Sequence, residues 1–129
     1  MDDGSREARE NGARMIMEHI QGKVQATPFV FMGDFNAPED SEALRISKGN
    51  SEANQKLGIE MVDSFRVLYP DLENVGTYNG FTGQSDGPKI DYIMVKSNMT
   101  VIEAYILQTN QKGRYPSDHF PVTAQVGLP

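Results

Sequence analysis

The spacing of apolar residues near the start of the chain predicts a helix. Between Glu7 and Ile20 apolar side chains recur at helical spacing while charged side chains occupy the opposite face, which is the pattern of an amphipathic helix packed on a core. Ser5 is a suitable N-cap for this helix and Gly22 a suitable stop. His19, in the middle of the helix, is interpreted as a structural or solvent-facing residue.

A continuous apolar run from Thr27 to Met32 predicts a strand that is buried on both faces, because the run lacks polar alternation and turn residues flank it. The polar sequence Gly33-Asp34-Phe35-Asn36 follows at the C-terminal end of this strand. After it, residues 38–41 indicate a turn and a helix start. A short helix should then include Ala43, Leu44 and Ile46.

The second half of the chain combines one more helix with several strands. Residues Met61 to Leu68 predict a short helix that ends at Tyr69-Pro70, and the segment 71–88, rich in Gly, Asn and Asp, predicts loops. Strands are predicted at Ile90–Val95, Val101–Leu107 and Pro121–Val126. The fold class is therefore α/β (α+β), with polar motifs at strand ends and in loops.

Composition narrows this picture. The chain has 129 residues, enough for one compact domain of an ordinary soluble protein, so we treat residues 1–129 as a single unit. It contains no Cys, which excludes disulfides, thiolate zinc sites and a cysteine nucleophile in this segment. The net charge of -6 argues against a broad nucleic-acid footprint and fits a small or locally held phosphate ester better. No targeting signal or membrane-length apolar run is visible, and localisation cannot be read from the sequence.

Three polar clusters interrupt otherwise apolar strands: Asp34 with Asn36, Asp91, and Asp118 with His119. A carboxylate at a buried strand is costly unless it is paired, hydrogen-bonded or bound to a cation. Each cluster has a simpler explanation when taken alone: an Asx turn, an exposed strand residue, or a turn histidine. Together they indicate a shared polar centre.

The sequences around these clusters resemble motifs of the endonuclease/exonuclease/phosphatase superfamily of DNase I-like phosphoesterases. Gly33-Asp34-Phe35-Asn36-Ala37, Lys89-Ile90-Asp91-Tyr92-Ile93 and Ser117-Asp118-His119-Phe120-Pro121-Val122 occur in the family's order. The first and last are specific in combination, whereas the middle one alone is weak. Residues 77–81 are similar to the family's substrate-side loop, which implies that Thr77, Tyr78 and Phe81 face the substrate.

The resemblance implies hydrolysis of a phosphate ester by in-line attack of water, with Mg²⁺ or Mn²⁺ as cofactor. In the implied roles, Asp34 orients or deprotonates the water and Asn36 binds a phosphate oxygen or positions that water. His119 donates to the phosphoryl oxygens, and Asp91 fixes its tautomer. Asp118 helps to hold the metal. Lys89 is expected at the surface.

The resemblance also implies a four-layer α/β/β/α sandwich of roughly twice this length, so we expect that the N-terminal half of the domain is missing from this chain. The missing part would supply an Asn, a metal-binding Glu and a His. Residues Met1 to Arg9 are similar to the segment that follows that His, which would make Met1 an internal methionine. One sheet face should then be left open as an apolar patch.

The sequence therefore predicts a Mg²⁺-dependent phosphoesterase that cleaves a phosphomonoester or phosphodiester, inactive or weak in this short form. Its partner would be a phosphate ester, either a small molecule or a nucleic-acid end. A first alternative is a 3'-5' exonuclease or deadenylase-type nuclease of the same superfamily. A second, of another class, is a non-catalytic half-domain that associates with a partner through its open sheet face.

Overall fold

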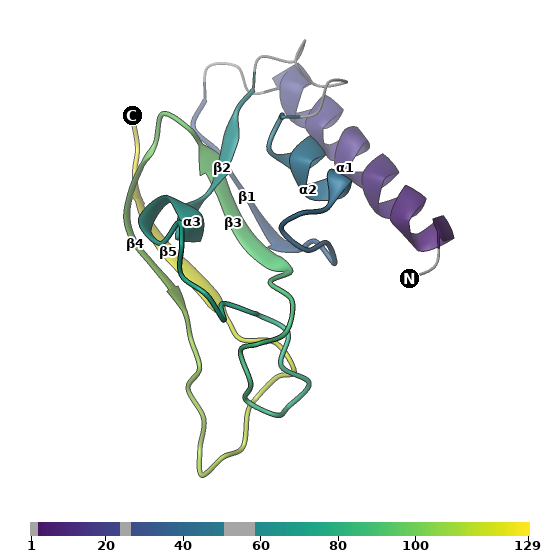
Figure 1. Ribbon diagram of the computed structural model, residues 1–129. Coiled ribbons are helices and arrows are strands. Elements are labelled where there is room, and N and C mark those ends of the chain that lie inside the picture. Colours follow the sequence, from purple (N-terminus) through teal and green to yellow (C-terminus); the bar gives the residue numbers. More distant parts are fainter. Residues whose placement is uncertain (1–2, 24–26, 51–58) are drawn as a thin grey trace.

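The computed structural model describes residues 3–23, 27–50 and 59–129. Its elements form three layers (Figure 1). The central layer is an antiparallel sheet in the order β1-β3-β2, and a hairpin of β4 and β5 forms a second sheet. The strands are β1 (Val30–Asp34), β2 (Met61–Asp63), β3 (Asp91–Lys96), β4 (Thr100–Ile106) and β5 (Val122–Gly127). The helices are α1 (Asp3–Lys23), α2 (Glu42–Ser47) and α3 (Ser64–Leu68).

The two faces of β3 belong to two separate hydrophobic cores. Tyr92 and Met94 are fully buried in a cluster with residues of α1 and α2. Ile93 and Val95 point to the other side, as alternate strand residues must, and pack with residues of α3, β4 and β5. Helices α1 and α2 thus cover one face of the sheet, and α3 with the β4–β5 hairpin covers β2 and β3 on the other face. This confirms the α/β class expected from the sequence.

The helices form largely where the pattern predicts them. Helix α1 begins at Asp3, before the expected cap Ser5, and continues through Gly22 to Lys23. An interior Gly lowers helix stability by only about 1 kcal/mol, which the packed face of this helix can offset. Helix α2 matches its prediction, and the side chain of Ser41 caps it by accepting from the Leu44 N–H.

Two predictions for single elements are wrong. Strand β1 is not buried on both faces: it lies at the edge of its sheet, and Val30 and Met32 are 41% and 68% exposed on the face that β4 and β5 leave uncovered. Residues Met61–Asp63 form a strand instead of the start of a helix, because they pair with β3. Helix α3 starts only after Asp63, whose side chain accepts from the Phe65 N–H.

The three strands predicted in the second half are confirmed to within one residue at each end. The long connections at 69–90 and 107–121 lie at the same end of the sheets (Figure 1). None of the helices within the described residues is both long and apolar enough to span a membrane.

Candidate active site

The pairing of β1 with β3 places two carboxylates opposite each other. Asp34 and Asp91 are direct partners in the antiparallel register, so their side chains lie on the same face of the sheet. Like charges in directly opposed positions destabilise a sheet unless a proton or a cation reduces their repulsion. This arrangement therefore marks a place where positive charge is favoured.

Asp34 and Asn36 occupy a tight turn at the end of β1. The Asn36 N–H donates to Oδ1 of Asp34 at 2.7 Å, and Asn36 has a positive φ of 46°, which Asn tolerates better than most residues. Asp34 and Asn36 therefore form the Asx turn that the simpler explanation predicts. Because both residues are exposed, the turn leaves the second carboxylate oxygen of Asp34 and the Asn36 amide facing solvent.

Asp91 and His119 form a close pair although they are 28 positions apart in the chain. Nδ1 of His119 lies 2.8 Å from Oδ2 of Asp91. This hydrogen bond is the main reason why the pKa of His119 is raised, and the charges of Asp91, Asp34 and Asp118 add to it while burial opposes it. A donating Nδ1–H leaves Nε2 as the free nitrogen of the ring.

The loop that precedes β3 holds the His119 segment in place. Tyr78 forms an isolated antiparallel bridge with His119, and their rings meet edge to face with centroids 5.4 Å apart. The Phe120 N–H donates to the Thr77 carbonyl at 2.7 Å. The imidazole is therefore supported by backbone pairing on one side and by an aromatic ring on another.

A cation would find ligands at this centre. Carboxylate oxygens of Asp34 and Asp91 and a ring nitrogen of His119 lie within 4.8 Å of one another. Oxygen ligands of this type suit Mg²⁺ or Mn²⁺, and a divalent cation would relieve the repulsion between the two carboxylates. The residues present therefore fit such a metal.

Asp118, the predicted metal ligand, does not belong to this group. Its carboxylate accepts from the Ser117 hydroxyl at 3.4 Å, and its carbonyl accepts from the N–H groups of Asn79 and Gly80. It is close enough for its charge to raise the pKa of His119. Its role as a ligand stays a prediction.

The three residues of the predicted substrate-side loop have different environments. Tyr78 and Phe81 are 42% and 62% exposed, and Phe81 adopts a positive φ of 64°, a strained conformation for a bulky residue. Thr77 is fully buried, and its hydroxyl accepts from the N–H groups of Ile90 and Asp91. Tyr78 and Phe81 can therefore meet a ligand directly, whereas Thr77 can act only through its neighbours.

Lys89 is buried, which contradicts the surface position expected for it. Its Nζ lies 2.7 Å from Oδ2 of Asp63, and both side chains are 2% exposed. The same ammonium group donates to the Asp91 carbonyl at 3.3 Å and lies 3.7 Å from the centroid of the Tyr92 ring. This pair could not be predicted from the sequence, because the two residues are 26 positions apart.

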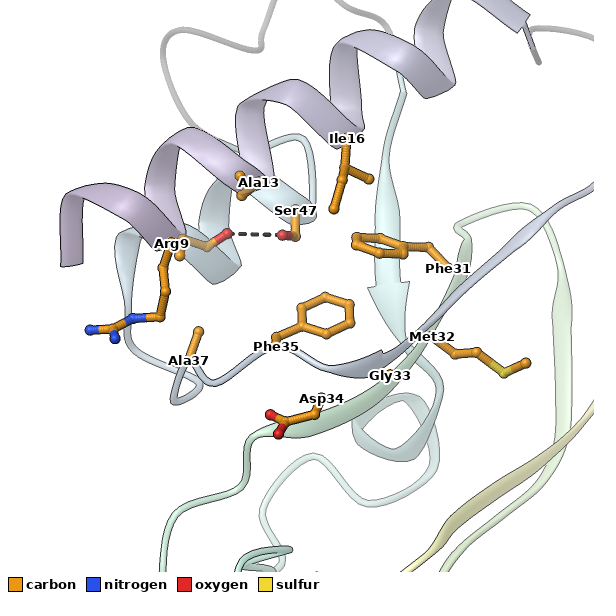
Figure 2. Close-up of a pocket in the computed structure, with 12 residues that line it drawn as sticks. Arg9, Ala13, Ile16, Phe31, Met32, Gly33, Asp34, Phe35, Ala37 and Ser47 are labelled. Carbon is orange, nitrogen blue, oxygen red and sulfur yellow. Dashed lines mark hydrogen bonds between the residues drawn. The ribbon is translucent and has the colours of Figure 1, made fainter. Parts of the chain in front are cut away.

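A cavity of about 240 Å³ lies between α1 and β1. Figure 2 shows Phe31 and Phe35 projecting from the β1 segment toward Ala13 and Ile16 of α1, with the Asp34 carboxylate directed away from them. The cavity is lined mainly by apolar side chains. Asp34 lies at the edge of this cavity, whereas Asp91 and His119 are not among its lining residues. Most of the polar centre therefore lies outside the cavity.

Comparison with known proteins agrees with the family resemblance that the sequence motifs indicated. The sequence profile of the Endonuclease/Exonuclease/phosphatase family matches residues 9–119. A conserved protein of unknown function from Enterococcus faecalis V583 is 31% identical, with a TM-score of 0.71 over 95% of this chain and 45% of that chain. No curated protein matches the sequence.

Two Bacteroides structures are also similar. The mannosyl-6-phosphatase of Bacteroides thetaiotaomicron VPI-5482 is 25% identical, with a TM-score of 0.69 over 95% of this chain and 46% of that chain. An endonuclease/exonuclease/phosphatase from Bacteroides vulgatus is 25% identical, with a TM-score of 0.72 over 96% and 45%. The chain spans less than half the length of these structures, and the likeness confirms the DNase I-like fold expected from the sequence.

Proposed function

Because the chain belongs to the Endonuclease/Exonuclease/phosphatase family, we propose that its Asp34, Asp91 and His119 form the centre of a metal-dependent phosphoesterase. The observation that carries this proposal is the 2.8 Å contact between His119 and Asp91, directly beside the opposed carboxylate of Asp34. An acid, a base and a place for a cation are then available within one small region.

The proposed reaction is attack of water on a phosphate ester. Asp34 accepts a hydrogen bond from the water and orients it, and the Asn36 amide binds that water or a phosphoryl oxygen. Asp91 holds the His119 ring so that it can donate from Nε2 to phosphoryl oxygens as their charge grows. A bound Mg²⁺ or Mn²⁺, held by Asp34 and its carboxylate neighbours with the help of Asp118, would supply positive charge for the same oxygens.

A phosphomonoester of a small molecule is the substrate class that we favour. One structural relative is a mannosyl-6-phosphatase, and the net charge of -6 does not favour tracking along a nucleic acid. The exposed rings of Tyr78 and Phe81 would give a sugar or another ring an apolar face to lie on. Cleavage at a nucleic-acid end is the second candidate.

The test compares turnover of three phosphate esters with Mg²⁺, with Mn²⁺ and with a chelator. A sugar 6-phosphate, p-nitrophenyl phosphate and bis(p-nitrophenyl) phosphate distinguish monoesterase from diesterase activity. Since the chain spans under half of its relatives, weak activity is expected from it alone. The assay should therefore be repeated with the chain joined to the N-terminal part of the Enterococcus relative.

His119→Ala should lower kcat by about 10²- to 10⁴-fold, the contribution typical of a positioned proton donor. His19→Ala is the matched control, because His19 is exposed on α1 and should leave kcat unchanged. Equal effects of the two substitutions, or metal-independent turnover, would contradict the proposal. The non-catalytic half-domain would be favoured if the chain associates tightly with itself and shows no turnover, either alone or joined to the N-terminal part. In that alternative, the open face bearing Val30 and Met32 binds a partner.

A further inference from the structure

We propose that Thr77 is a positioning residue that holds Asp91 and His119 at hydrogen-bonding distance, an inference that rests on the hydrolytic function proposed above. Asp91 and His119 belong to segments that are remote in the sequence, β3 and the connection before β5. Their 2.8 Å contact therefore requires a link that fixes the two segments relative to each other. Thr77 makes hydrogen bonds to both.

On the β3 side, the link is the Thr77 side chain. Its Oγ1 accepts from the Ile90 N–H at 2.9 Å and from the Asp91 N–H at 3.1 Å. These two donors lie at the start of β3, where Thr77 gives them a side-chain acceptor. A hydroxyl oxygen has the two acceptor sites that this arrangement needs.

On the His119 side, the link is the Thr77 backbone. Its carbonyl accepts from the Phe120 N–H at 2.7 Å, next to His119 in the chain, while its own N–H donates to the Pro88 carbonyl at 3.0 Å. Thr77 is also completely buried, so water cannot easily replace these bonds. One residue thus ties the carboxylate-bearing strand end to the imidazole-bearing segment.

Replacing the hydroxyl should loosen the pair without removing either member. Thr77→Val keeps the shape of the side chain but leaves the N–H groups of Ile90 and Asp91 without their acceptor in a buried place, which is costly. The start of β3 should then shift or open more often, and the Asp91–His119 bond with it. Thr77→Ser keeps the acceptor and should preserve the bond.

The readout is the Nδ1–H proton of His119 in the NMR spectrum of the free chain at one fixed pH. The sequence contains two His, which makes assignment simple, and Asp91→Asn gives the reference spectrum of a disrupted pair. The wild type should show a low-field, slowly exchanging Nδ1–H signal. In Thr77→Val this signal should be lost or exchange with water about tenfold faster or more, and in Thr77→Ser it should remain.

Thr82→Val is a matched control in the same loop. The Thr82 hydroxyl also accepts from a backbone N–H, that of Gln84, but has no bond to the segments of Asp91 or His119, so the His119 signal should not change. A folded Thr77→Val protein with a wild-type signal would overturn the proposal. If that variant does not fold, Thr77→Cys, with a weaker sulfur acceptor, should exchange faster than Thr77→Ser, and equal rates would overturn it.

The spectra are recorded without substrate, so the result does not depend on turnover. Loss of the signal in Thr77→Val together with absent hydrolysis by the wild-type sequence, alone and joined to the N-terminal part, would reject the proposed function and leave the structural link intact. Retained signal together with clear hydrolysis would reject the role of Thr77 alone. The two proposals can therefore fail separately.

Discussion

Two pairs, each of a carboxylate and a nitrogen base, lie near the start of β3 and have nearly the same length. Asp63 and Lys89 are 2.7 Å apart with both side chains 2% exposed. Asp91 and His119 are 2.8 Å apart, with His119 26% and Asp91 14% exposed. The distance alone does not distinguish them, and the difference lies in how far each pair is removed from water.

Burial dominates the protonation behaviour of the first pair, and a hydrogen bond dominates that of the second. The pKa of Lys89 is lowered chiefly by burial, although Asp63 pulls in the opposite direction. The pKa of His119 is raised chiefly by its hydrogen bond to Asp91. The first pair is therefore held together against a desolvation cost and suits a structural role. The second pair is partly exposed, so it can exchange protons with solvent and meet a ligand, as the role proposed for it requires.

Breaking the buried pair should have the largest effect on stability. Lys89→Met leaves the Asp63 carboxylate buried without its cation and should lower the free energy of unfolding by about 3–5 kcal/mol. Urea unfolding followed by circular dichroism measures this change. Adding Asp63→Asn, which keeps a cap for α3, should recover part of the loss, because no buried charge is then left alone.

The control for this comparison is the two ion pairs that Glu10 makes on the surface of α1, where Glu10 is 18% exposed and the two arginine side chains are 73% and 39% exposed. Glu10 contacts Arg6 and Arg14 on α1 at 3.5 Å in each case, and Glu10→Gln should change the free energy of unfolding by less than about 0.5 kcal/mol. A Lys89→Met loss as small as that of Glu10→Gln would show that burial does not separate the two kinds of pair.

The sequence pointed to the members of the proposed catalytic pair, Asp91 and His119, but not to the buried pair of Asp63 and Lys89. Asp91 and His119 stand in motifs whose residue types are informative, and Asp34 follows an apolar run that predicts a strand. Lys89 stands in such a motif too, yet its burial depends on Asp63, 26 positions away. The hydrogen bonds of Thr77 could not be read from the sequence, because its hydroxyl accepts from the backbone N–H groups of Ile90 and Asp91, and backbone groups leave no trace in residue type.

The secondary structure also could not be predicted where it depends on contacts between segments distant in the sequence. The strands of the second half could be placed to within a residue because each shows either alternation of apolar and polar residues or enrichment in β-branched residues. The strand Met61–Asp63 could not, since it is defined by pairing with β3 and is too short to show a period. The exposure of Val30 and Met32 likewise depends on which face the β4–β5 hairpin covers.

A smaller effect should come from the carboxylates that face each other. Asp34→Asn removes the repulsion with Asp91 and, in the presence of a chelator, should raise the free energy of unfolding by about 0.5–1 kcal/mol. In the wild type, millimolar Mg²⁺ should increase stability by mass action, and Asp34→Asn should abolish most of that response. Thermal unfolding with and without Mg²⁺ measures both.

Asp86→Asn serves as the control for charge removal, because Asp86 is exposed in the loop before β3. It should change neither the stability nor the response to Mg²⁺. If Asp34→Asn behaves in the same way as Asp86→Asn, the two opposed carboxylates do not share a cation.

The smallest expected effect is the pH dependence of the stability that the partly exposed pair of Asp91 and His119 contributes. Because the pKa of His119 is raised in the folded protein, the folded state binds its proton more tightly than the unfolded state does. The stabilisation is therefore fully present below the unfolded pKa of about 6.5 and is lost as pH rises through the higher folded value. Since solvent reaches His119, the loss should be only about 0.5 kcal/mol. Urea unfolding between pH 5 and pH 9 without divalent cations should show this decline in the wild type and not in Asp91→Asn, whereas an equal decline in both proteins would mean that Asp91 is not its cause.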